Sequence, residues 1–223
     1  MLHFEALFPT KGKYMKTSCV ACDLDFCLSH FGQNILADFV DLFLFTGVER
    51  QIIADIETEA ERHRFTFESF FRIFTERTGI ALDAEKLLPQ CRDWLENYLQ
   101  LYPESREWFD SRVSSHIPVV IVTYGDPEFQ GAKLQMLRLR PAMTFYTMRT
   151  GEKHLVLRRL VQRYGPGVLF VDDNPLEHDN VRDAGFSSEE VRTVRVLRPD
   201  TPYRDRPAKH QHEEVQVLSD IHF

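Results

Sequence analysis

The chain has 223 residues, of which 43% are hydrophobic and 27% charged, and its 34 acidic side chains outnumber 27 basic ones. This length suits an α/β domain that carries a smaller subdomain, and the composition is that of a globular protein rather than a disordered one. The formal net charge of −7 argues against a general binder of nucleic acid or of anionic membranes, because either would need a basic face.

Neither a membrane span nor a signal peptide is expected at the start of the chain. No stretch of the sequence reaches the roughly 20 apolar residues of a membrane span. Residues 1–18 carry scattered charges and no apolar region of the signal-peptide kind. We therefore expect a cytoplasmic protein that does not bind membranes.

Cys19 and Cys22 have the CxxC spacing of metal and redox sites. They lie in an apolar stretch typical of a β-strand, where residues three apart point to opposite faces. We therefore expect both side chains to pack in the core, and neither a shared metal nor a disulfide. Reduced cysteines fit a cytoplasmic protein.

Apolar runs typical of buried parallel strands recur along the chain. They are residues 18–24, 117–123, 168–172 and 191–197, with a weaker candidate at 142–148. Helical patterns lie between them, at 128–138, 152–164 and 177–184. Because strand and helix alternate, the sequence predicts an α/β fold with a parallel sheet covered on both faces.

The segment from about residue 30 to residue 104 differs from the rest, because helical periodicity dominates it and no convincing strand appears. Its apolar stripes are rich in Phe and Leu, and such stripes are far more often core than cofactor contacts. We predict four amphipathic helices here. The α/β core then consists of residues 1–29 and 105–223, and a helical subdomain of residues 30–104 interrupts it.

Asp23 and Asp25 follow the first predicted strand. Carboxylates at positions i and i+2 project to one side of a strand and can offer Mg²⁺ the hard oxygen ligands that it prefers. Asp-x-Asp also occurs in ordinary turns. The pair alone is therefore a weak signal.

Thr123 ends the second predicted strand and precedes Tyr124 and Gly125. A hydroxyl beside a glycine turn can hold a phosphate oxygen with help from backbone N–H groups, although a simple helix cap is the alternative. Lys153 stands at a helix start, where the positive end of the helix dipole disfavours lysine unless an anion lies nearby. A solvated surface lysine is the other interpretation.

Asp172 and Asp173 directly follow the strand at 168–172. Adjacent carboxylates repel each other unless a cation lies near them. A turn that caps the next helix is the alternative. Together with the three sites above, the pair should lie at one edge of a parallel sheet, where open α/β sheets bind their ligands.

In these residues the chain resembles the haloacid dehalogenase-like (HAD) hydrolase superfamily. Four motifs match in order: Asp23 with Asp25, then Thr123, then Lys153, then Asp172 with Asp173. The resemblance spans residues 18 to about 197 and implies a Rossmann-like core, with the insertion at 30–104 as a helical C1-type cap. Cys27 departs from the family, which usually has Thr or Val there.

The resemblance also implies a chemistry, that of a phosphatase acting on a small phosphorylated metabolite. Asp23 would be the nucleophile and Asp25 the general acid and base, while Thr123 and Lys153, with Tyr124 and Gly125, would bind the phosphoryl group. The Mg²⁺ ligands would be Asp23, the backbone carbonyl of Asp25, and Asp173 or Asp172. We favour Asp173 because some family members use the second position of such a pair.

Several alternatives remain open at this point. A phosphomutase shares the whole residue set, a dehalogenase would not need Asp25 or a metal, and a catalytically silent binding protein could keep the fold. Lys133 competes with Lys153 for the phosphate, but it lies only ten residues beyond Thr123. The sequence does not define the oligomeric state.

Two further groups of residues are expected to be solvated rather than functional. His210 and His212 could be metal ligands, but the polar composition of the tail around them predicts a solvated loop. Residues 215–218 could form a short apolar element within this tail. Cap residues 62–64, which are Arg-His-Arg, could meet an anionic leaving group, but an exposed helix face is the stronger interpretation.

Overall fold

The computed structural model describes residues 16–223, so the prediction about a leader at the start of the chain lies largely outside the described residues. Six strands form one sheet, in the order β5-β4-β1-β6-β7-β8, and all neighbouring strands are parallel. The strands are β1 Cys19–Cys22, β4 Val119–Tyr124, β5 Met143–Thr147, β6 Val168–Asp172, β7 Val191–Val196 and β8 Glu213–Val215. The five predicted strands are therefore confirmed, and β8 adds a sixth at the edge.

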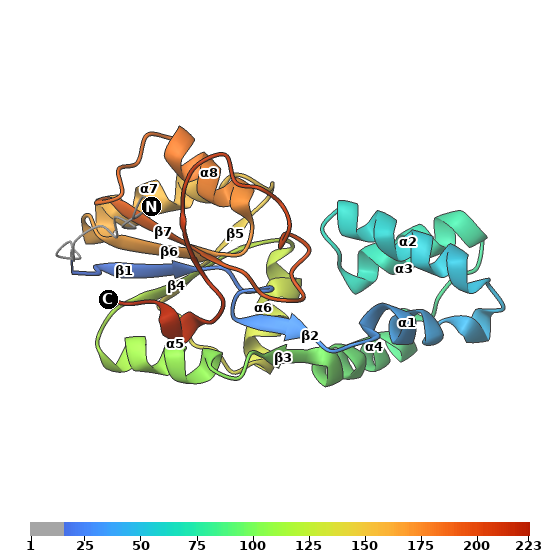
Figure 1. Ribbon diagram of the computed structural model, residues 1–223. Coiled ribbons are helices and arrows are strands. Elements are labelled where there is room, and N and C mark those ends of the chain that lie inside the picture. The colour runs from blue at the N-terminus through green and yellow to red at the C-terminus, as the bar shows by residue number, and fades with distance from the viewer. Residues whose placement is uncertain (1–15) are drawn as a thin grey trace, which may run out of the picture.

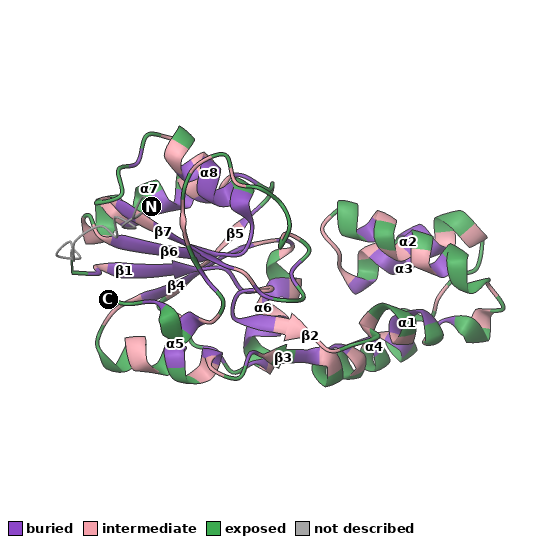
Figure 2. Ribbon diagram, viewed as in Figure 1, coloured by how far each residue is buried: buried purple, intermediate pink, exposed green. Residues whose placement is uncertain are grey.

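Helices cover both faces of this sheet (Figure 1). Helices α7 (Lys153–Tyr164) and α8 (Pro175–Asp183) pack on one face, while α5 (Ser105–Ser114) and α6 (Pro127–Met136) pack on the other. Figure 2 shows the strands buried between these two layers. The predicted α/β class and the Rossmann-like parallel sheet are confirmed.

The two cysteines of the CxxC sequence pack on opposite faces of β1. Cys19 belongs to the apolar cluster under α7 and α8, whereas Cys22 belongs to the cluster under α5 and α6. Both side chains are fully buried free thiols. The predicted core packing of this pair is confirmed.

Four helices lie within residues 35–98 and form a body set to one side of the sheet (Figure 1). They are α1 Ile35–Asp41, α2 Arg50–Arg62, α3 Phe67–Thr78 and α4 Ala84–Tyr98, with a short 3-10 turn at Leu44–Thr46. Their interior is largely aromatic: the Phe70 ring centroid lies 4.9 Å from that of Phe39 and 4.7 Å from that of Phe43. The predicted helix number is confirmed, and this body is referred to below as the cap.

A small antiparallel ribbon connects the cap to the core, so the expectation of no strand between residues 30 and 104 was wrong. The ribbon pairs β2 (Ser29–Phe31) with β3 (Leu99–Leu101). Strands of three residues are too short to show an alternating pattern, and their partners lie far apart in the sequence. The chain therefore enters and leaves the cap through adjacent strands.

The C-terminal segment returns to the sheet rather than extending into solvent. After β7 it runs past the carboxyl end of the sheet, adds β8 and ends near a 3-10 turn at Leu218–Asp220. The expectation that both tail histidines are solvated was wrong for His212, whose side chain is 1% exposed. Its ring nitrogens contact Thr193 Oγ1 at 3.0 Å and Asp179 Oδ1 at 3.1 Å, so packing against α8 buries it.

Across residues 16–223, no helix has the length and apolar character needed to cross a membrane.

Candidate active site

The carboxyl ends of the central strands bring the predicted polar residues together at one edge of the sheet. Asp23 follows β1, Thr123 lies near the end of β4, and Asp172 and Asp173 stand at the end of β6. β1 pairs directly with both β4 and β6, so these three strand ends are neighbours. Residues that are up to 150 positions apart thus meet because parallel strands end on the same side.

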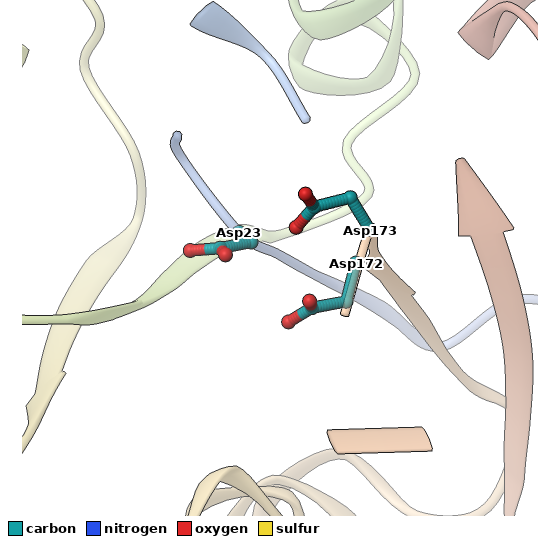
Figure 3. Close-up of side chains that lie close together, drawn as sticks. All are labelled: Asp23, Asp172 and Asp173. Carbon is teal, nitrogen blue, oxygen red and sulfur yellow. The ribbon is translucent and has the colours of Figure 1, made fainter. Parts of the chain in front are cut away.

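Three of these residues form a compact acidic cluster (Figure 3). Carboxylate oxygens of Asp23, Asp172 and Asp173 lie within 4.8 Å of one another, and all three residues are buried. The Lys153 ammonium, only 2% exposed, lies 2.8 Å from Asp23 Oδ2 and 2.7 Å from Asp172 Oδ2. The anion expected beside the lysine at the start of α7 is therefore present.

The electrostatics of the cluster follow from burial and from the excess of carboxylates. Burial raises the pKa of Asp23 to about 7, although Lys153 opposes the shift and Asp172 adds to it. Burial, with repulsion from Asp172 and Asp23, raises the pKa of Asp173 to about 8. Burial alone would lower the pKa of Lys153, but the attraction of Asp172, Asp23 and Glu177 outweighs it and holds that pKa above its ordinary value.

The donor set fits a divalent cation. One ammonium offsets only one of the three carboxylates, so the fully ionised cluster keeps two negative charges in a buried site. Oxygen ligands of this kind suit Mg²⁺. Burial is the main cause of the raised pKa values of Asp23 and Asp173, and repulsion from the neighbouring carboxylates adds to it.

Asp172 and Asp173 differ in what they bind. Asp172 Oδ2 accepts from Lys153 at 2.7 Å, and its Oδ1 accepts from the Asn174 backbone N–H at 2.9 Å. Asp173 Oδ2 accepts from the Thr201 hydroxyl, and among the described residues no basic side chain forms an ion pair with Asp173. Asp173 is therefore the better candidate for a direct metal ligand, as the sequence analysis favoured.

Asp25 stands apart from the acidic cluster. Its carboxylate accepts from Lys133 Nζ at 2.8 Å and from Gln130 Nε2 at 3.2 Å. The Asp25 side chain therefore lies outside the acidic cluster. The expected contact of Asp25 with Mg²⁺ is through its backbone carbonyl. Lys133 was considered for phosphate binding, but the structure pairs it with Asp25.

The turn after β4 lines the same cavity as the acidic cluster and Asp25. Thr123 is buried at the end of the strand, and Thr123, Tyr124 and Gly125 all line the cavity above the acidic cluster. Gly125 has φ +134°, a conformation that side chains disfavour, and a Cβ there would lie 2.9 Å from Gln130 Nε2. The glycine therefore permits the close approach of this turn to α6.

The sequence analysis missed two residues that support the site. Glu177 in α8 accepts from the Gly151 N–H at 2.6 Å and from the Lys153 N–H at 3.3 Å, and so it holds the loop that presents Lys153. Thr201 reaches Asp173 from the C-terminal segment. Glu177 begins the predicted helix at 177–184 and Thr201 lies far from any motif, and no local pattern marks either as a partner of the site.

A cavity of about 940 Å³ lies between the acidic cluster and the cap. Aromatic side chains form much of its wall, namely Phe26, Phe31, Phe39, Phe65, Trp94, Phe129 and Tyr203. Arg62 and His63 are exposed, as expected, and Arg64 is half-buried. Arg64 lines the cavity, and its Nη1 lies 3.1 Å from Met148 Sδ beyond β5.

Comparisons with known proteins give no match at the level of sequence families: no family model matches the chain, and neither does any curated protein. Solved structures do match. A protein from Burkholderia xenovorans LB400 described as haloacid dehalogenase-like is 15% identical with a TM-score of 0.67, and the match covers 91% of this chain and 94% of that one.

Two further matches carry more specific names. A HAD phosphatase from Thermococcus onnurineus is 17% identical with a TM-score of 0.62, over 90% of this chain and 94% of that one. An L-2-haloacid dehalogenase from Xanthobacter autotrophicus is 13% identical with a TM-score of 0.57, over 92% and 96%. The order of the sheet, the inserted helical body and these matches agree: the chain has the fold of the haloacid dehalogenase-like hydrolases.

Proposed function

We propose that the protein is a magnesium-dependent phosphatase that hydrolyses a small phosphorylated metabolite by way of a phosphoryl group carried on Asp23. The observation that carries this proposal is the arrangement at the sheet edge. The buried Asp23 carboxylate lies beside the Lys153 ammonium and the carboxylates of Asp172 and Asp173. Asp25, outside this cluster, lines the same cavity. Phosphoryl transfer needs this kind of positioning and charge neutralisation more than it needs unusual reactivity.

Each residue then has a defined task. Asp23 attacks the phosphorus and forms an acyl phosphate. Lys153, 2.8 Å from Asp23, and the Thr123 hydroxyl bind the oxygens of the transferring group, and Tyr124 and Gly125 line the cavity beside them. Asp25 donates a proton to the departing alcohol and then takes one from the water that cleaves the intermediate.

Asp23, Asp173 and the backbone carbonyl of Asp25 would hold Mg²⁺. When bound, the ion supplies positive charge that reduces the repulsion between the attacking carboxylate and the phosphate. The cap helices and the aromatic wall exclude bulk water from the cavity and shape the space for the leaving group.

A dehalogenase is the main alternative, and the structurally similar proteins include enzymes of that name. By the family resemblance, a dehalogenase needs neither the second acid nor a metal. Asp25 is held by two donors and lines the cavity, which favours the phosphatase. A phosphomutase would use the same residues and differs only in what accepts the phosphoryl group.

The proposal extends to partners and location. The proposed ligand is a small phosphorylated compound. We propose no binding to nucleic acid or to membranes, because the chain is acidic overall. All four cysteines are free thiols, which fits the cytoplasmic setting that we propose.

The test is a turnover assay of the purified protein on a panel of phosphorylated metabolites, an aryl phosphate and 2-haloacids, with Mg²⁺ and with a chelator. We expect phosphate release that requires Mg²⁺ and disappears in Asp23→Asn. Lys86→Met, on the exposed start of α4, is the matched control and should retain full activity. Halide release without added metal, and no phosphate release, would contradict the proposal.

A further inference from the structure

The cavity between the acidic cluster and the cap has many more acidic than basic side chains in its wall. Eight of the residues that line it are Asp or Glu, and three are Lys or Arg. Two of the three cations already have carboxylate partners: Lys153 pairs with Asp23 and Asp172, and Lys133 pairs with Asp25. The rest of the cavity keeps an excess of carboxylates, and a cleft of this kind favours cations over anions.

Two of these carboxylates come from the cap. Glu57, which is half-buried, and Glu61, which is exposed, lie one turn apart in α2, and both line the cavity. Within residues 16–223 neither forms an ion pair with a basic side chain. Burial, with repulsion and a hydrogen bond from Glu61, raises the pKa of Glu57 to about 8. Like charges at this spacing destabilise a helix, so a bound cation would be favourable beside this pair.

Aromatic side chains are the second feature of this part of the cavity. Those of the cap that are half-buried and line it are Phe65 and Trp94. Aromatic faces attract ammonium groups, and the face of Trp does so most strongly. The same cavity already shows this contact, because the Lys133 ammonium lies 5.0 Å from the ring centroid of Phe31 and 4.9 Å from that of Phe129. Carboxylates and aromatic faces together suit an organic cation.

Arg64 does not reverse the charge of the cap wall. It is the one Lys or Arg among the cap residues that line the described cavity, against the two carboxylates of Glu57 and Glu61. Its Nη1 lies 3.1 Å from Met148 Sδ, so the guanidinium reaches across to the core beyond β5 instead of pairing with either glutamate. An anionic leaving group would therefore meet more negative than positive charge on the cap.

We propose that the leaving group of the substrate carries an ammonium group, which Glu57 and Glu61 bind with Phe65 and Trp94 beside it. The substrate class is then the phosphate monoesters of amino alcohols. This inference rests on the proposed phosphatase function and deepens it. Water cleaves the ester P–O bond overall and gives inorganic phosphate and the free amino alcohol. The ammonium group takes no part in the bond changes.

The experiment measures kcat and KM for ω-aminoalkyl phosphates of increasing chain length, and for the n-alkyl phosphates in which a methyl group replaces the ammonium group. The two members of each pair have nearly the same shape and differ in charge. We expect KM for the best ammonium ester to be about 10- to 100-fold lower than for its alkyl counterpart, the range of hydrogen bonds to charged groups. Glu57→Gln/Glu61→Gln should lose this difference and leave KM for the alkyl ester nearly unchanged. The control is Glu96→Gln, on the exposed side of α4, which should keep the difference.

Glu61→Lys is an independent check, because Glu61 is exposed and the substitution leaves the core unchanged. It should shift the preference toward a carboxyalkyl phosphate. A wild type that shows no preference within the pairs, or that prefers a carboxyalkyl or a sugar phosphate to every ammonium ester, would overturn the inference while the phosphatase proposal stands. A wild type that releases phosphate from none of these esters and from none of the metabolite panel would overturn both.

Discussion

Asp173 owes its orientation to residues outside its own strand. The Thr201 hydroxyl donates to its Oδ2, and Arg195 Nε donates to its backbone carbonyl at 3.3 Å. Partners of this kind fix the direction in which a ligand points and commonly account for about 10- to 100-fold in metal affinity. The C-terminal segment therefore contributes to the proposed metal site without contributing a ligand.

We expect Thr201→Val to weaken Mg²⁺ binding about 10-fold, because the isosteric side chain removes the donor to Asp173 and the acceptor of the Tyr203 N–H. Isothermal titration with Mg²⁺ measures the effect. Thr75→Val is the control, since the Thr75 hydroxyl donates to the Phe71 carbonyl of its own helix at 3.0 Å, away from the site. Equal Mg²⁺ affinity in Thr201→Val and the wild type would mean that Thr201 has no role in orienting Asp173.

The sequence predicted individual residues where a local pattern surrounds them. Asp23 follows an apolar strand and Lys153 begins a helix, and both lie in the site. The partners of these residues could not be predicted. Lys133 pairs with an aspartate 108 positions away, and Thr201 with one 28 positions away, so only the folded chain brings them together.

At the scale of elements, the ribbon of β2 and β3 carries both chain crossings between core and cap. Besides the pairs of the ribbon itself, Gly32 N–H donates to the Tyr98 carbonyl at 2.9 Å. The cap has a largely aromatic interior, and we expect it to move as one body while the ribbon bends. We expect the cap to close over a bound substrate and to open again for its release.

We expect vanadate with Mg²⁺, a mimic of the transferring phosphoryl group, to favour the closed arrangement. Hydrogen exchange should slow in the ribbon and on the cavity side of α2, and remain unchanged in β1 and β4, which are buried in both states. Mass spectrometry of peptides from these elements measures this. Identical exchange in the ribbon with and without vanadate would mean that the cap does not close over the site.

The longer elements were predictable and the short ones were not. Strands β4, β6 and β7 have five or six residues each and stand out as apolar runs. Strands β2 and β3 have three residues each and form only because they pair with one another. Helix α5 was also missed, since Trp108 and Phe109 are its only large buried apolar residues.

For the whole molecule, the acidic cluster makes stability depend on pH and on metal. Asp23 and Asp173 have a pKa of about 7 and about 8 in the folded chain, against an ordinary value of 3.8. Between these values the folded state binds more protons than the unfolded state. The stability that these two groups contribute is therefore fully present below their ordinary pKa of 3.8. It is lost as the pH rises through their pKa values in the folded chain, about 7 and about 8.

We expect the metal-free protein to lose stability as the pH rises from about 4 to about 8, by at most about 1.4 kcal/mol per group for each pH unit. Saturating Mg²⁺ should remove most of this slope, because the ion stabilises the ionised carboxylates. Thermal unfolding in chelator and in Mg²⁺ across this pH range measures both effects. Asp173→Asn isolates the contribution of that group, and a chelated wild type whose Tm depends on pH no differently from that of Asp173→Asn would contradict the assignment of the shift.

At this scale the sequence predicted the fold and the place of the site, because alternating strands and helices permit few arrangements and the strand ends of a parallel sheet meet at one edge. The substrate could not be predicted. The cavity wall combines residues from the cap, the ribbon, the core and the C-terminal segment, such as Phe39, Phe31, Phe129 and Tyr203. Their meeting depends on long-range packing.

The most direct test of the central claim is rapid-quench trapping of a phosphoenzyme, using an aryl phosphate labelled at phosphorus in the presence of Mg²⁺. The account predicts acid-stable label on Asp23 in the wild type, and more of it in Asp25→Asn if loss of the base slows its hydrolysis. Asp23→Asn should trap none. Label on any other residue, or wild-type turnover by Asp23→Asn, would contradict the account.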